Sequence, residues 1–118
     1  MDIENIRDYC LSKKGVTEEL PFDETTLVFK VIGKIFLITD VEGPLSISVK
    51  CEPENAIVLR EEYSSVTPAY HMNKTHWNSI DIDGLISDKL IFQWIDDSYF
   101  LVIKKLTLKQ KEELNKMH

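Results

Sequence analysis

Two adjoining segments rich in β-formers constrain the fold of this chain most. Residues 26–32 and 34–39 are dense in β-branched and aromatic side chains, and Gly33 separates them, which predicts a tight hairpin. After a turn at Glu42-Gly43-Pro44, residues 45–51 alternate between apolar and polar side chains, as in a strand with one buried face. Three consecutive strands joined by short turns predict an antiparallel meander.

Helical patterns flank these strands. The segments that follow Asp2, Pro53 and Ser87 carry apolar residues at helical spacing, and Thr107 opens a capping box for a short final helix. One more short strand is expected at residues 77–82. The predicted order is α-β-β-β-α-β-α-α. Because the strands cluster instead of alternating with helices, the expected class is α+β, with helices packed on one face of an antiparallel sheet.

Length and charge narrow the function classes. The 118 residues correspond to one domain, residues 1–118, and no apolar run approaches the roughly 18 residues of a membrane span. Cys10 and Cys51 are the only cysteines, and the N-terminus lacks a secretory pattern, so we expect reduced thiols and a cytoplasmic location. The net charge of −6 repels polyanions and anionic lipid, so any nucleic-acid contact must come from one face.

One window of the chain departs from this acidic character. None of the 20 acidic residues falls between Ser64 and Ile80, yet the window holds two of the three histidines, a lysine, a tryptophan and a tyrosine. A locally cationic, aromatic segment on an acidic protein indicates a binding surface.

Catalytic and metal-binding patterns are not found. The four glycines are scattered and cannot form a phosphate-binding loop. His71 and His76 are five residues apart and would diverge on a helix, while Cys10 lies on an apolar helical stripe. Asp81 and Asp83 share a strand face but offer few oxygen ligands for a hard cation. We therefore expect a non-enzymatic protein that needs no cofactor and no metal.

The window also resembles a known family signature. Residues 70–78, Tyr-His-Met-Asn-Lys-Thr-His-Trp-Asn, are similar to the signature of the MmcQ/YjbR-like family. Further similar segments occur in family order at residues 20–23, 28–31, 33–36, 50–54, 59–60 and 98–102. Asp23 and Ala69 stand where the family often has glycine, and the Ala69 side chain disfavours a positive backbone angle. The resemblance implies a CyaY-like (frataxin-like) α+β fold and the label of a double-wing DNA-binding protein.

The resemblance places a DNA contact at residues 71–78 and the adjoining hairpin. Lysines and histidines would meet phosphates, while asparagine and tryptophan side chains would approach sugars or bases. The candidate binding residues are Tyr70, His71, Asn73, Lys74, His76, Trp77, Asn78, Lys30, Lys34 and Lys50.

Two alternatives remain open for this surface. Lysine and histidine donors beside aromatic walls also suit an acidic protein segment or a small anionic ligand. Alternatively the motif is a scaffold, in which Trp77 anchors a sheet edge and His71 and His76 bond to backbone carbonyls of an irregular loop.

Overall fold

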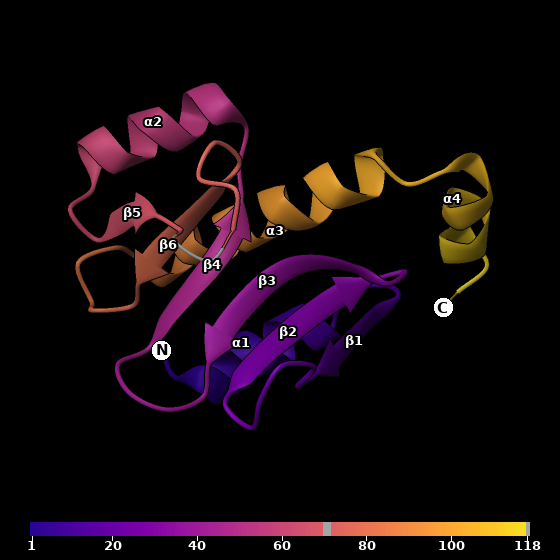
Figure 1. Cartoon of the computed structure of the whole chain (residues 1–118), viewed down its shortest axis with the longest axis horizontal. Helices are drawn as coiled ribbons and strands as arrows, with labels where there is room; N and C mark the ends of the chain where they lie inside the picture. Colours follow the sequence, from indigo (N-terminus) through magenta and orange to yellow (C-terminus); the bar gives the residue numbers. More distant parts are fainter. Residues whose placement is uncertain (70–71, 118) are drawn as a thin grey trace.

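The computed structural model describes residues 1–69 and 72–117, and within them an open antiparallel sheet of six strands carries helices on one face (Figure 1). The elements in chain order are α1 (Ile3–Leu11), β1 (Val16–Glu19), β2 (Thr26–Val31), β3 (Lys34–Asp40), β4 (Ser46–Lys50), α2 (Pro53–Glu62), β5 (Val66–Pro68), β6 (Trp77–Asp81), α3 (Asp88–Lys104) and α4 (Leu108–Asn115). In these same ranges, no helix combines the length and apolarity needed to cross a membrane.

The sheet has the strand order β1-β2-β3-β4-β6-β5, and every pairing is antiparallel. The α+β class and the meander are confirmed, but the predicted element order is wrong because it omits β1 and β5. The edge strand β1 reads Val-Thr-Glu-Glu, with a single apolar residue, so its pattern resembles a polar loop. The strand β5 has only three residues and includes Pro68, which cannot donate to a ladder.

The tight hairpin predicted around Gly33 joins β2 to β3. Ile32 and Gly33 both have positive φ angles, 47° and 76°, as a two-residue turn of the hairpin type requires. A β-branched residue such as Ile32 is strained in this conformation. Its side chain packs against the core, which offsets that strain and fixes the hairpin tip.

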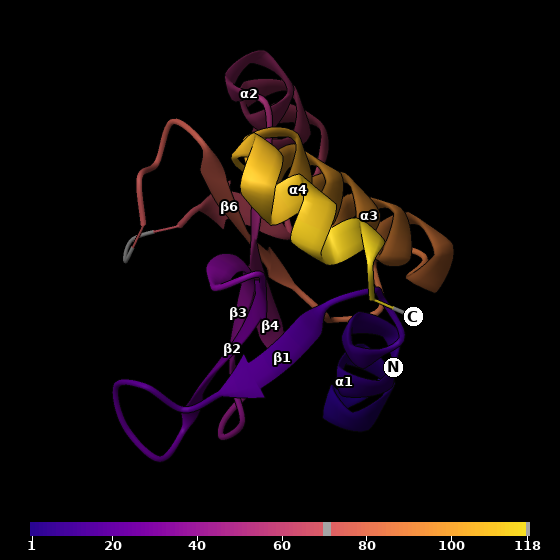
Figure 2. The ribbon, with the colours of Figure 1, turned by 90° about the vertical axis from the view of Figure 1, so that its right-hand side faces the viewer.

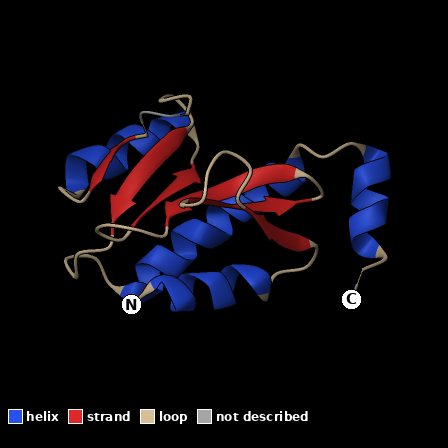
Figure 3. Cartoon of the chain, turned by 60° about the horizontal axis from the view of Figure 1, so that its bottom comes forward, coloured by secondary structure: helices blue, strands red, loops and turns tan. Residues whose placement is uncertain are grey.

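A single hydrophobic core lies between the sheet and the helices. Figure 2 shows α1, α3 and α4 on the same side of strands β1–β4. The core joins Phe29, Leu37 and Val49 of the sheet to Ile6 of α1 and Ile95 of α3. Figure 3 shows that α4 stands apart at one end of the molecule, beyond the end of α3.

One buried hydroxyl links α3 to two strands. Ser98 is fully buried, and its Oγ donates to the Phe36 carbonyl at 2.5 Å and accepts from the Lys50 amide at 2.8 Å. The Phe36 carbonyl can accept this hydrogen bond because the β2–β3 register shifts at this residue. Phe29 pairs with Leu37 and Lys30 pairs with Ile35, so the register skips Phe36. The hydroxyl therefore sets the position of α3 relative to the end of β4.

Replacing this hydroxyl tests its structural role. Ser98→Ala leaves a buried carbonyl and a partly buried amide without their partner, so we expect a loss of about 1–3 kcal/mol in the free energy of unfolding. Urea denaturation measures the change, with Ser64→Ala in an exposed turn as the control. Equal stability of the two variants would contradict the role given to Ser98.

Candidate functional site

The loop that leads into β6 is stabilised by its own hydrogen bonds. The Asn73 carbonyl accepts from the amides of His76 and Trp77 at 3.1 and 2.9 Å, and the Asn73 side chain accepts from the Thr75 amide at 2.9 Å. The His76 carbonyl in turn accepts from the Cys51 amide at 2.7 Å, which ties the loop to the end of β4. Tyr70 and His71 lie outside the described residues.

Arg60 of α2 supports the same loop from the other side. Its Nε donates to the Asn78 side-chain oxygen at 2.6 Å, and its second guanidinium nitrogen donates to the Lys74 carbonyl. The Asn78 amide nitrogen donates to the Ala56 carbonyl at 3.3 Å. Asn78 is only 1% exposed, so these bonds supply the partners that a buried amide needs.

The structure divides the predicted binding residues into two groups. Trp77 is 7% exposed and Asn78 is buried, so both side chains are largely enclosed by the protein. Lys30 forms an ion pair with Glu19 of the neighbouring strand at 2.8 Å. Lys34, Lys50 and His76, by contrast, line surface cavities, and Trp77 forms part of one wall.

Three adjoining cavities follow the C-terminal half of α3, and together we call them the α3 groove. The first, of about 470 Å³, extends from the β2–β3 hairpin to α3 and includes Lys50 and Lys105 in its walls. The second, of about 210 Å³, shares those two lysines and adds His76, Glu52 and Lys104. The third, of about 280 Å³, shares Glu52 and Lys104 with the second.

The first two cavities form the basic part of the groove. Their walls carry four lysines, and none of the four forms an ion pair with a carboxylate in residues 1–69 and 72–117. These lysines are Lys34, Lys50, Lys104 and Lys105. Burial lowers the pKa of Lys50, and the nearby charge of Lys105 lowers it further, while Glu52 partly opposes this. An anionic group placed here would relieve the repulsion and favour the charged form of Lys50.

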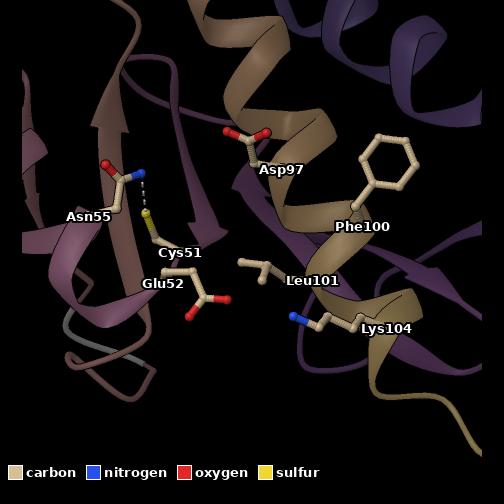
Figure 4. A pocket seen from close by; sticks show the side chains of 7 residues that line it. All are labelled: Cys51, Glu52, Asn55, Asp97, Phe100, Leu101 and Lys104. Carbon is tan, nitrogen blue, oxygen red and sulfur yellow. Dashed lines mark hydrogen bonds between the residues drawn. The ribbon is translucent and has the colours of Figure 1, made fainter.

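The third cavity has a different character (Figure 4). Glu52 projects from the β4–α2 junction and Asp97 from α3, and Phe100 also lines the cavity, with its ring directed away from the two carboxylates. The Asn55 amide donates a long hydrogen bond of 3.6 Å to the Cys51 sulfur. Burial raises the pKa of the Cys51 thiol, so this sulfur is a poor nucleophile at neutral pH.

Sequence patterns missed three residues of this region. Arg60, Lys104 and Lys105 were not among the predicted site residues, although Arg60 supports the loop and the two lysines line the groove. The helix dipole alone favours cations at a helix C-terminus, so the positions of Lys104 and Lys105 in the sequence do not by themselves indicate a function. Only the packing of α3 against the sheet brings them beside Lys50.

The fold and the groove define a class of small α+β proteins with an open antiparallel sheet and helices on one face. The YjbR family model matches residues 11–101. The chain belongs to the YjbR family, which confirms the resemblance found in residues 70–78.

Relatives and solved structures agree with this assignment. A protein of Escherichia coli strain K12 that bears the name uncharacterized protein YjbR is 31% identical over 115 residues, which cover 97% of this chain and 98% of that protein. Uncharacterized protein YbdF of E. coli O157:H7 is 34% identical over 109 residues, or 86% of this chain and 89% of its own length.

Two crystal structures have similar folds. The Deinococcus radiodurans protein DR2400, with a DUF419 domain, superposes with a TM-score of 0.90 at 36% identity, covering 97% of this chain and 88% of that one. A Pseudomonas syringae protein superposes with a TM-score of 0.75 at 27% identity, covering 86% of this chain and 98% of its own.

The support of the loop by Arg60 can be tested through Asn78. Asn78→Ala removes the acceptor of Arg60 Nε and a buried donor, so we expect unfolding free energy to fall by about 1.5–3 kcal/mol. Asn73→Ala is the matched control, because its hydrogen bond to Thr75 is exposed and we expect a loss below about 1 kcal/mol. Urea denaturation of both variants measures the difference. Similar losses in the two would show that Asn78 has no special role.

Proposed function

We propose that this protein is a cytoplasmic, non-enzymatic binding protein that holds an anionic group in the basic part of the α3 groove. The observation that carries this proposal is the set of four lysines around two adjoining cavities, none ion-paired within the described part of the chain. These lysines come from the β2–β3 hairpin, the end of β4 and the end of α3. An acidic protein that gathers more cations than carboxylates at one place favours an anion there.

The walls of the first cavity strengthen the attraction. Trp77, Met72 and Ile35 stand on the sheet side, and Val102 and Leu106 stand on the helix side. Apolar walls reduce the local dielectric screening, so a charge-assisted hydrogen bond from Lys50 or Lys105 is stronger here than on an open surface. A mostly apolar hollow with a few convergent cations is typical of a site for a carboxylate or a phosphate.

A compact anion is favoured over duplex DNA, the ligand that the family resemblance implies. The enclosed side chains of Trp77 and Asn78 have little surface for bases, and Lys30 is paired with Glu19. Four phosphate contacts, one for each lysine of the basic part of the groove, would give a salt slope of only about −3.6 on B-DNA. The net charge of −6 opposes even that binding at long range.

The proposal that this protein is not an enzyme rests on the protonation state of its two cysteine thiols. Burial raises the pKa of the Cys10 thiol to about 12, and burial also raises the pKa of Cys51. Both thiols are therefore protonated at neutral pH. No general base lies in hydrogen-bond contact with either sulfur in the described residues, where the Cys51 partner is the amide of Asn55.

The proposal is tested by titrating ¹⁵N-labelled protein with a tetraglutamate peptide and, separately, with inorganic phosphate at low salt. We expect saturable shift changes at Lys50, His76 and Lys105. Lys50→Gln and Lys105→Gln should each weaken tetraglutamate binding about tenfold, because each removes one charge-assisted hydrogen bond of about 1.4 kcal/mol.

Lys89→Gln is the charge-matched control, since Lys89 is an exposed lysine at the start of α3, outside the groove. Its affinity should stay within about twofold of the unmodified protein, as is usual for a surface change away from the site. Absence of saturable binding by either anion would overturn the proposal. A 12-base-pair DNA duplex that binds tighter than tetraglutamate, with a steep salt dependence, would favour a nucleic-acid ligand instead.

A further inference from the structure

The α3 groove is longer than a single anion requires, and its two ends carry opposite charge. We infer that its ligand is an extended peptide segment with acidic residues at one end and a basic residue at the other. This inference rests on the proposed function, since the acidic end of the peptide occupies the site of the anion. It adds the class of ligand and its orientation in the groove.

The length of the groove sets the length of the segment. Asp97, near the middle of α3, lines the third cavity, and Lys105, the residue that caps the end of α3, lines the first. Eight residues separate them (105 − 97), which corresponds to ~12 Å along a helix at 1.5 Å per residue. An extended chain rises about 3.3 Å per residue, so about four peptide residues span this distance.

The third cavity provides the acidic end. Glu52 and Asp97 both line it, and neither carboxylate forms an ion pair anywhere in the described ranges. Asp97 accepts a hydrogen bond from the Gln93 side-chain amide at 2.9 Å. Two carboxylates that flank a hollow suit an ammonium or guanidinium group of a ligand.

Lys104 lies between the two ends and belongs to the walls of both the second and third cavities. Figure 4 shows its ammonium group directed into the hollow between α3 and the β4–α2 junction. Lys34, Lys50 and Lys105 line the first cavity, Glu52 joins three lysines in the second, and Glu52 and Asp97 line the third with Lys104, so the charge changes from positive to negative along the groove. A ligand with separated charges matches this order, whereas a uniformly acidic one meets repulsion at the third cavity.

The rim of the third cavity supplies an apolar contact. Phe100 is 61% exposed although it is a large apolar side chain, and Leu101 adjoins it in the same wall. The Phe100 ring lies edge-to-face with Tyr99, at a centroid distance of 5.6 Å, so its position is supported by the protein. Exposed aromatic side chains that are already positioned are the usual anchors of peptide recognition, because little side-chain entropy is lost on binding.

Two synthetic peptides of identical composition test the inference. Both are acetylated and amidated, so their termini carry no charge. One has the order lysine-leucine-alanine-glutamate-glutamate, and the other interleaves the same residues as glutamate-lysine-leucine-glutamate-alanine. We expect the first peptide to bind at least about tenfold more tightly, because only it places one charge sign at each end.

Variants of the acidic end distinguish this inference from the proposed function. The double variant Glu52→Gln with Asp97→Asn should weaken the charge-separated peptide about tenfold and tighten tetraglutamate binding, since Glu52 also lines the second cavity and its repulsion of the anion is removed. Glu112→Gln with Glu113→Gln, two exposed residues of α4, is the control with the same change in net charge. Phe100→Ala should weaken the charge-separated peptide about fivefold and leave phosphate binding unchanged.

The results of these binding experiments distinguish a failure of the inference from a failure of the proposed function. If tetraglutamate binds at Lys50 but the two peptides bind equally and the double variant has no effect, the inference of a polarised peptide site is wrong and the proposed function stands. If neither tetraglutamate nor phosphate binds, the proposed function fails, and this inference fails with it. A preference for the charge-separated peptide that is lost in the double variant of Glu52 and Asp97, but kept in the control variant, supports both the proposed function and the inference.

Discussion

The position of α3 on the sheet depends on the buried hydroxyl of Ser98. It joins the Phe36 carbonyl of β3 and the Lys50 amide of β4 to the middle of α3, with bonds of 2.5 and 2.8 Å. Because Lys50 is held at this point, the last turns of α3 come to lie beside it. The α3 groove exists because of this contact: one wall is the helix, and the other is the sheet end with the β4–α2 junction.

The opposite wall depends on Arg60, which holds the loop before β6 through Asn78 and the Lys74 carbonyl. The Ser98 contact holds α3, and the Arg60 contact holds the loop before β6. The two supported elements come together at neighbouring residues, because the Lys50 amide donates to the Ser98 hydroxyl and the Cys51 amide donates to the His76 carbonyl. Fixed walls keep the lysines close together despite their mutual repulsion, and burial together with the charge of Lys105 lowers the pKa of Lys50. Such preorganised repulsion costs stability in the free protein and is relieved when an anion binds.

Much of the fold could be predicted from local patterns, and much of the site could not. The alternation around Ile47, the turn at Gly33 and the caps at Ser87 and Thr107 depend on neighbouring residues, so the sequence predicts them correctly. The strands β1 and β5 are too short and polar to show a period. Lys34 and Lys50 were expected in the site, but the grouping with Lys104 and Lys105 depends on tertiary packing. From the sequence alone, Trp77 and Asn78 are equally compatible with a ligand contact and with a structural role. Their burial in the structure distinguishes these two roles.

The most direct test of the anion site is the pKa of the Lys50 ammonium group, measured by NMR titration of its side-chain ¹⁵Nζ with and without tetraglutamate. We expect this pKa to lie below the ordinary value of a lysine in the free protein, because burial and the charge of Lys105 disfavour the charged form. Addition of the peptide should raise it, since a carboxylate favours the ammonium form. A Lys50 pKa at the ordinary lysine value and unchanged by the peptide would contradict an anion site in the α3 groove.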